Sequence, residues 1–183
     1  NVFITPIEYL SEIKHIKNKY RRVRFKGFLK RHSVELPINP YILGVWLGDG
    51  FSKSSCFVIN NKDVEIRKEL DKFANLNNFK LKEVDNKMKS CYQLYLSDRT
   101  GKNNRFIDNL RGLGVWGDKH IPKKYINSSI EQMLSLLAGI IDTDGGRYKK
   151  TNVYSVETSD KKLIKDIYSI AKSCGLVCSE MKT

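Results

Sequence analysis

Two aspartates, Asp49 and Asp144, stand 95 residues apart in nearly the same local setting. Each follows an apolar run and precedes a glycine, a residue that is common just beyond the C-terminus of a helix. A carboxylate there meets the negative end of the helix dipole, at a cost of roughly 0.3–1 kcal/mol. Two such carboxylates brought together would also repel each other, and a divalent cation between them would remove both penalties. Carboxylate oxygens suit Mg²⁺, so the pair is a candidate magnesium site.

The two apolar runs also carry small residues four positions apart. These are Gly44 and Gly48 in the first run, and Gly139 and Thr143 in the second. Residues at this spacing share one face of a helix, and small ones let two backbones approach closely. One such run alone would favour a buried core helix. Two runs that both end in Asp-Gly favour a pair of helices packed along their small faces.

At these residues the chain resembles a known family. Residues 137–145 read LAGIIDTDG, which departs from the LAGLIDADG signature of homing endonucleases only by Ile for Leu and Thr for Ala. Residues 43–50, LGVWLGDG, resemble the more divergent first copy found in intein-encoded members. The resemblance extends from about residue 37 to the end of the chain. It implies a saddle-shaped fold in which two half-domains meet at the motif helices and each sheet lies along DNA.

The resemblance also implies a site and an activity. Asp49 and Asp144 would hold Mg²⁺, with the backbone carbonyls of Gly48 and Thr143 facing the metals. Lys119 lies in a KHIP block at residues 119–122 that is similar to the family's block before the second motif. A lysine there acts near the scissile phosphate in intein nucleases, so Lys119 is a candidate to orient water or stabilise transition-state charge. One more surface lysine is the alternative.

Two further residues near these motifs are interpreted as structural. Asp142 does not share a helix face with Asp144, although the motif names it. His120 fits a loop or packing residue better than a general base.

The charge balance indicates a polyanionic partner, since 33 Lys and Arg residues stand against 20 acids and the formal net charge is +13. A basic but inert surface is the alternative. Segments 79–84 and 92–96 alternate as in a hairpin, with Leu81, Leu94 and Leu96 on the core side. A two-stranded ribbon of this kind can enter a major groove. The candidate DNA contacts are Lys80, Lys82, Gln93 and Tyr95 on its outward face, Lys87 and Lys89 at its tip, and Arg147, Lys149 and Lys150 in the second half.

The first 38 residues form a basic segment. From Ile13 to Val34 there is no acid, and nine lysines and arginines occur, among them Arg21, Arg22 and Arg24. Thr5 and Pro6 favour a helix start, and residues 20–26 alternate roughly as in a strand. A phosphate-binding arm and a solvated basic edge explain this segment equally well.

The remaining pattern predicts an α+β fold with an internal duplication. A motif helix capped by Asn39, a strand at 56–60, a helix at 63–75, the hairpin and a helix at 106–113 form one half-domain, residues 39–127. The helix at 63–75 has Val64, Ile66, Leu70, Phe73 and Ala74 as its expected apolar face.

The second half-domain, residues 128–183, repeats the start of this order. We expect a motif helix opened by a capping box from Ser128 to Glu131, strands at 147–150 and 152–158, a helix from Asp160 to Gly175, and a strand at 176–178. Its hairpin and last helix are missing. We therefore expect an incomplete half-domain of a longer intein precursor, with poor stability for these residues alone.

Composition excludes other classes. No run reaches the roughly 18 apolar residues of a membrane span, and no signal peptide is visible. The four cysteines are scattered without a CxxC pair, which indicates reduced thiols, no zinc site and an intracellular protein. We expect a pseudo-symmetric monomer that binds double-stranded DNA. A relative that binds DNA without cleaving it, an RNA maturase, and a parent protein whose main activity is protein splicing remain alternatives.

Overall fold

The computed structural model describes Ser11 and residues 31–84, 90–101, 103–148, 150 and 153–179. The helix start expected at Thr5 and Pro6 and the alternating segment 20–26 lie outside these residues. So do Lys87, Lys89 and Lys149, three of the candidate DNA contacts.

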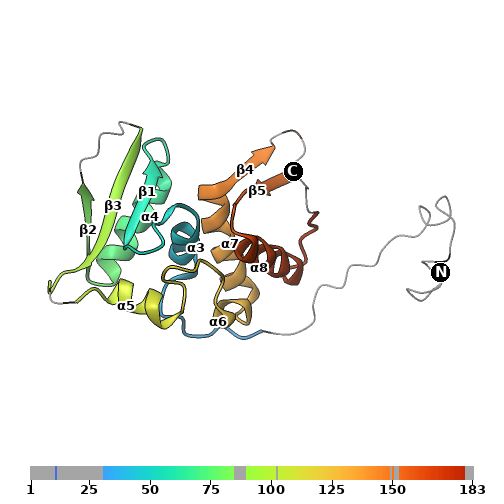
Figure 1. The fold of residues 1–183 in the computed structure, drawn as a ribbon, viewed down its shortest axis with the longest axis horizontal. Helices are drawn as coiled ribbons and strands as arrows, with labels where there is room; N and C mark the ends of the chain where they lie inside the picture. The colour runs from blue at the N-terminus through green and yellow to red at the C-terminus, as the bar shows by residue number, and fades with distance from the viewer. Residues whose placement is uncertain are drawn as a thin grey trace.

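The described residues form a mixed α+β structure with small antiparallel sheets (Figure 1), as the sequence predicts. One sheet has the strand order β1-β3-β2 and the other consists of β4 and β5. The elements are α3 (Pro40–Asp49), β1 (Cys56–Asn60), α4 (Val64–Leu76), β2 (Phe79–Val84), β3 (Cys91–Asp98), α5 (Arg105–Gly112), α6 (Lys123–Ile126), α7 (Ile130–Asp144), β4 (Gly145–Tyr148), β5 (Val153–Val156) and α8 (Lys161–Ser173).

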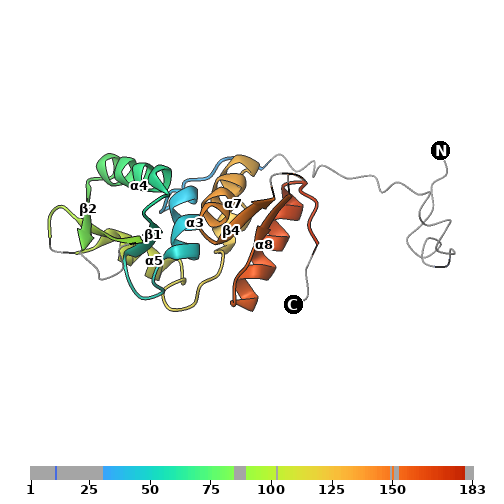
Figure 2. The same ribbon diagram turned by 90° about the horizontal axis from the view of Figure 1, so that it is seen from above.

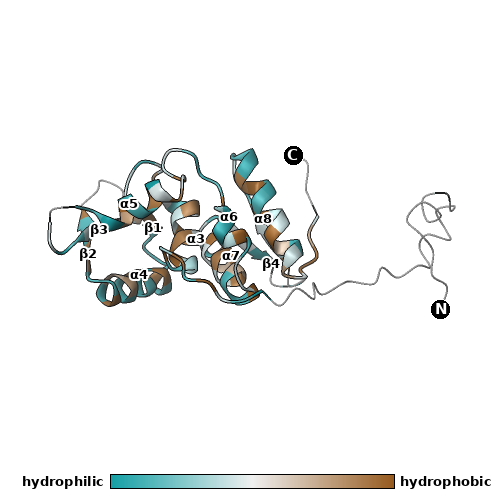
Figure 3. Ribbon diagram, turned by 90° about the horizontal axis from the view of Figure 1, so that it is seen from below, coloured by the Kyte–Doolittle hydropathy of each residue, from teal (hydrophilic) through white to brown (hydrophobic). Residues whose placement is uncertain are grey.

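Helices α3 and α7 lie side by side at the centre of the molecule, with the three-stranded sheet on one side and β4, β5 and α8 on the other (Figures 1 and 2). Much of both central helices is apolar, as the brown colour in Figure 3 shows. One buried cluster joins the two sides and includes Trp46, Phe57, Leu136 and Ile167. Within the described residues, no helix has the length and apolar character needed to cross a bilayer.

Both central helices have capped N-termini. The Asn39 side chain accepts hydrogen bonds from the backbone N–H groups of Tyr41 and Ile42, which confirms the predicted cap of α3. Helix α7 also begins with a capping box, but it is built from Ser129 and Gln132. The predicted box from Ser128 to Glu131 is therefore wrong by one residue. Ser128 is buried and its hydroxyl donates to the Tyr125 carbonyl at 2.7 Å, so it closes α6 instead.

The segment that leads into α3, residues 31–38, is fastened to α6 and to the start of α7. The Gln132 side chain accepts a hydrogen bond from the Val34 N–H at 3.1 Å and donates to the Val34 carbonyl at 2.7 Å. The Arg31 guanidinium donates to the carbonyl of Ile126. The buried Tyr125 hydroxyl donates to the carbonyl of Ile38 at 2.7 Å. One side chain, Gln132, thus both caps α7 and holds the incoming chain.

Helix α4 and the hairpin follow the predicted pattern with one exception. Ile66, Leu70 and Ala74 are buried and Phe73 is half-buried, but Val64 is 49% exposed, so its assignment to the apolar face is wrong. At about 3.6 residues per turn, Val64 lies on a different face of the helix from the buried Ile66, Leu70 and Ala74.

The predicted faces of the β2–β3 hairpin are confirmed. Leu81 pairs with Leu96, and Lys82 pairs with Tyr95. Leu94 and Leu96 are buried in the core, whereas Lys80 and Lys82 are not buried. Gln93 and Tyr95 are half-buried on the side of the sheet that Lys80 and Lys82 share.

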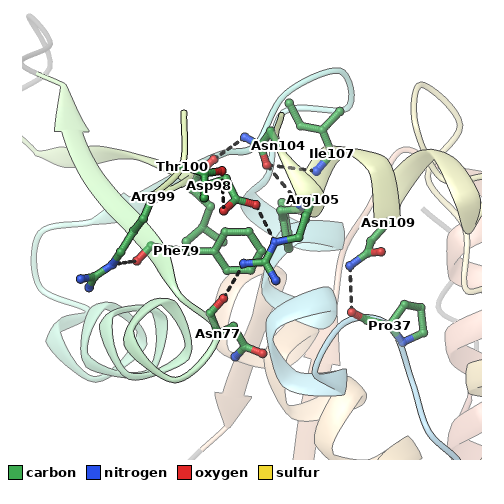
Figure 4. A network of polar contacts seen from close by, with 12 residues as sticks. Pro37, Asn77, Phe79, Asp98, Arg99, Thr100, Asn104, Arg105, Ile107 and Asn109 are labelled. Carbon is green, nitrogen blue, oxygen red and sulfur yellow. Dashed lines mark hydrogen bonds and ion pairs between the residues drawn. The ribbon is translucent and has the colours of Figure 1, made fainter. Parts of the chain in front are cut away.

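A polar network fastens this sheet to α5 (Figure 4). The Arg105 guanidinium donates to the buried Asp98 carboxylate at 2.6 Å and to the Asn77 carbonyl at 2.8 Å, and it lies over the Phe79 ring. The Asn104 side chain caps α5 and donates to the Leu96 carbonyl at 2.6 Å. The Arg105 guanidinium holds the pKa of the Asp98 carboxyl below its usual range, although burial opposes this shift.

Helix α8 is confirmed, but the strand predicted after it is wrong. Asp160 caps the helix as expected, and Gly175 ends it with a positive φ of 80°. The Gly175 N–H donates to the Lys172 carbonyl and the Leu176 N–H donates to the Ala171 carbonyl, so the chain after the helix is used to close it. Residues 176–178 form no strand, and Val177 is 68% exposed.

Candidate active site

The close approach of α3 and α7 depends on the small residues that the sequence singles out. A Cβ atom on Gly44 would overlap the Leu136 carbonyl oxygen and lie 3.1 Å from the Cα of Gly139. A Cβ atom on Gly139 would lie 2.8 Å from the Val45 nitrogen. Real Cβ atoms essentially never lie within 3.0 Å of another atom, so a side chain at either position would force the two backbones apart. The predicted packing of the two helices along their small faces is therefore confirmed.

The same contact continues one turn further, at the ends that carry the acids. A Cβ atom on Gly48 would lie 2.9 Å from the Cβ of Thr143 and 3.5 Å from the carboxyl carbon of Asp144. The Thr143 hydroxyl turns back into its own helix and donates to the carbonyls of Gly139 and Ile140, each at 3.0 Å. Asp144 on α7 thus lies beside the last turn of α3, which ends at Asp49.

The two carboxyl groups share an unfavourable environment for negative charge. Burial, together with the nearby Asp144 carboxylate, raises the pKa of Asp49 to about 6. Burial also raises the pKa of Asp144. Both residues are half-buried at helix C-termini, where the dipole disfavours a carboxylate further. The site therefore favours a compensating positive charge.

Lys119 supplies one such charge. Its ammonium group donates a hydrogen bond to the Gly48 carbonyl oxygen at 2.9 Å and lies 5.4 Å from the centre of the Trp46 ring. Burial lowers the pKa of this lysine, and the charges of Asp144 and Asp49 oppose that shift. The charge of Lys119 in turn opposes the rise in the pKa of both carboxyls that burial causes, but it does not cancel that rise. The structure thus places the two predicted acids and the predicted lysine together.

Asp142 takes no part in this group. Its exposed carboxylate accepts a hydrogen bond from the Tyr41 hydroxyl at 2.9 Å, which ties α7 to the first turn of α3. Burial and this bond raise the pKa of Tyr41. The contact agrees with a structural role for Asp142.

The donor atoms at the site fit magnesium better than a soft metal. Asp49, Asp144 and the Gly48 carbonyl offer only oxygen, which Mg²⁺ prefers. Among the residues that the structure describes, no group of three or more His, Cys, Asp or Glu side chains could hold a metal. Magnesium needs no such group, because it commonly binds one or two carboxylates and fills its shell with water and substrate phosphate.

The described candidate DNA contacts are divided between the two sheets. Lys80, Lys82, Gln93 and Tyr95 share one face of the three-stranded sheet. Arg147 and Lys150 are exposed at the β4–β5 ribbon, where the Arg147 guanidinium lies 5.9 Å from the centre of the Tyr154 ring.

Three residues of the site environment were not predicted from the sequence. Trp46 lies under the Lys119 ammonium group, Asp63 raises the pKa of Asp49, and Asp160 lies near enough to raise that of Lys119. Trp46 could have been found, because it precedes Asp49 by three positions and so shares its side of α3. In the sequence, Asp63 and Asp160 indicate only where two helices begin, and nothing there relates them to the site.

Comparison with known proteins matches most of this chain to part of a helicase and its C-terminal third to a homing endonuclease family. The replicative DNA helicase DnaB of Mycobacterium intracellulare is 26% identical over 144 residues, which cover 79% of this chain and 20% of that protein. The chain therefore spans about a fifth of the length of this curated relative. Residues 120–183, which include α7, Asp144, β4, β5 and α8, match the family described as homing endonuclease.

Proposed function

We propose that this chain is the nuclease domain of an intein, a site-specific double-strand DNA endonuclease of the LAGLIDADG type that requires Mg²⁺. The observation that carries the proposal is the meeting of Asp49 and Asp144 at the ends of two helices in backbone contact, beside the Lys119 ammonium group. The homing endonuclease match over residues 120–183 supports it. The formal net charge of +13 suits a polyanionic substrate.

The arrangement of the elements supports a duplicated pair of half-domains, residues 39–127 and 128–183, after a basic segment at 1–38. Helices α3 and α7 are each followed by an antiparallel pairing, from Gly50 to Phe57 and from Gly145 to Val156. Helices α4 and α8 come next, and each has 13 residues. In this proposal the α3–α7 contact is the axis of a pseudo-symmetric monomer, the two sheets lie along the DNA, and each half makes one cut.

The chemistry is phosphodiester hydrolysis. Bound Mg²⁺ supplies Lewis-acid charge neutralisation at phosphorus, and Asp49, Asp144 and the carbonyls of Gly48 and Thr143 would hold it. Lys119 stabilises negative charge as it develops on the phosphate. Its hydrogen bond to the Gly48 carbonyl holds the ammonium group beside the two acids before DNA arrives.

The setting inside an intein is supported by the extent of the relative. A segment that matches a nuclease family and aligns with a fifth of a protein named for a different activity is the pattern of an insertion in a host protein. The nuclease then acts inside the cell on double-stranded DNA.

The test is cleavage of a supercoiled plasmid library with random inserts, with Mg²⁺ or with EDTA. Wild type should linearise a defined subset of plasmids only with Mg²⁺. Asp49→Asn and Asp144→Asn should abolish cleavage and keep DNA affinity, whereas Asp142→Asn should cleave, since its carboxamide oxygen can still accept the Tyr41 hydrogen bond. DNA binding by wild type without cleavage would instead identify a relative that has lost its nuclease activity.

A further inference from the structure

The loop that carries Lys119 is held from both sides of the molecule. On one side, the Gly117 N–H donates to the Ser52 carbonyl at 2.8 Å, just beyond α3. On the other side, two residues of α8 hold the loop. The Asp166 carboxylate accepts a hydrogen bond from the Ile121 N–H at 3.0 Å, and the Lys162 ammonium group donates to the Asp118 carboxylate at 2.7 Å. Lys119 lies between these attachments.

The two contacts from α8 share one face of the helix, because Lys162 and Asp166 are four residues apart. They differ in burial. Ile121 is 2% exposed, so Asp166 satisfies a buried N–H that would otherwise have no partner. The side chains of Lys162 and Asp118 are 53% and 60% exposed, and an exposed pair of this kind is weak and screened by salt. Asp166 is therefore the stronger of the two attachments.

We propose that Asp166 is a positioning residue for Lys119, with Lys162 in a supporting role. This inference rests on the proposed nuclease function only for its effect on rate. Helix α8 belongs to the segment after α7, whereas the Gly48 carbonyl that receives Lys119 belongs to α3. Asp166 thus acts across the centre of the molecule. It sets the position of Lys119 beside Asp49 and Asp144, although Asp166 contacts neither acid.

The first experiment reads the position of Lys119 without DNA or metal. The folded protein is treated with a limiting amine-acylating reagent, and the modification of Lys119 is measured by mass spectrometry relative to the exposed Lys123 and Lys124. Asp166→Ala should raise the relative labelling of Lys119 several-fold. Asp166→Asn should leave it near wild type, because a carboxamide oxygen still accepts the Ile121 hydrogen bond. Lys165→Ala, at an exposed position on the same helix, is the matched control.

The second experiment reads the rate. With a plasmid that wild type cleaves, Asp166→Ala should lower kcat about ten- to a hundred-fold, the usual cost of a small misplacement of a catalytic group. KM and DNA affinity should stay near wild type, and Asp166→Asn should recover most of kcat. Lys162→Met, which removes only the exposed ion pair, should raise Lys119 labelling less than Asp166→Ala does. Lys162→Arg, which keeps a cation beside Asp118, should leave the labelling near wild type.

The outcomes separate the two proposals. If wild type cleaves no DNA but Lys119 labelling follows the pattern above, the nuclease assignment fails and the positioning role stands. If Asp166→Ala folds and leaves Lys119 labelling unchanged, the positioning role is wrong whatever the nuclease does. If Asp166→Ala does not fold, unchanged labelling in Lys162→Met would overturn the proposal, and raised labelling that Lys162→Arg reverses would support it.

Discussion

The ammonium group of Lys119 donates a hydrogen bond to the carbonyl oxygen of Gly48, 71 residues earlier in the chain and 2.9 Å away. This bond places a cation on the C-terminal end of α3, where the helix dipole is negative. Asp49 follows at the next position, and Asp144 lies across the helix contact. One lysine therefore offsets three sources of negative potential at once.

We predict that Lys119→Met slows cleavage and makes the fold less stable at pH 8 relative to pH 4. Loss of a positioned charge donor typically lowers kcat by about 10²–10³. Loss of the same cation leaves the two half-buried carboxylates without their neighbour, so the melting temperature should fall more at pH 8 than at pH 4. Lys123→Met, at an exposed position in α6, is the control. Equal melting temperatures for wild type and Lys119→Met across this range would contradict the electrostatic role.

We predict that Asp49→Asn stabilises the metal-free protein above pH 6. Burial and Asp144 raise the pKa of Asp49 to about 6, whereas an unfolded aspartate titrates near 3.9. The folded state therefore binds the proton more tightly, and stability from this group is full below about pH 4 and is lost as the pH rises through 6. An amide avoids that loss, so the variant should gain about 2 kcal/mol at pH 8 and nothing at pH 3.5.

Chemical unfolding of wild type and Asp49→Asn in EDTA at these two pH values measures the gain. Asp71→Asn, at an exposed position on α4, is the control. A destabilised Asp49→Asn at pH 8 would show that the Asp49 carboxylate is favourably paired in the folded state.

Both motif helices and their meeting could be predicted from the sequence, because the pattern is local and repeated. The glycines at positions 44 and 139 could be assigned to a contact since only small residues allow two backbones to touch. The loop that carries Lys119 could be placed at the site only through the resemblance of residues 119–122 to the homing endonuclease family. The attachments that hold it, from Asp166 and Lys162, join residues 44 or 45 positions apart through single hydrogen bonds. Such contacts have no period or spacing that a sequence displays.

The errors have similar physical causes. The observed capping box of α7 lies one residue later than expected because two adjacent serines precede the helix. The hydroxyl of Ser128 donates to the Tyr125 carbonyl of α6, and Ser129 caps α7 instead. The expected strand at 176–178 needed an edge to pair with, and within the described residues the chain there closes α8 instead.

We predict that Gly44→Ala unfolds the helix pair far more than Gly112→Ala does. The new methyl at position 44 would overlap the Leu136 carbonyl, while a Cβ on Gly112 in α5 meets nothing within 4 Å. Overpacking of this kind costs about 1–3 kcal/mol. Alanine in an open helical position gains about 0.5–1 kcal/mol. Thermal unfolding of both variants gives the comparison, and equal melting temperatures would contradict the observed backbone contact.

We predict that Asp98→Asn destabilises the protein at neutral pH and not in strong acid. The Arg105 guanidinium lowers the pKa of Asp98, so this carboxylate contributes stability above the unfolded value near 3.9 and loses it as the pH falls through the lower folded value. The gap between wild type and variant should therefore narrow as the pH falls below the unfolded value. Melting curves from pH 2 to 7 test this, with Asp108→Asn on the exposed side of α5 as control.

We predict that the basic segment adds to DNA affinity by neutralising phosphates. Replacing Arg21, Arg22 and Arg24 by alanine should reduce the salt dependence of DNA binding by about 0.9 in the log–log slope for each phosphate that is no longer neutralised. The slope is measured by fluorescence anisotropy at several salt concentrations. An unchanged slope would mean that this segment does not reach the duplex.

The double use of Gln132 has a mechanical consequence. Its Oε1 accepts hydrogen bonds from the N–H groups of both Val34 and Ser129, and its Nε2 donates to the Val34 carbonyl. A displacement of the chain at Val34 is therefore transmitted to the start of α7, the helix that ends at Asp144. A displacement of the residues upstream of Val34 would thus change the alignment of Asp49 and Asp144.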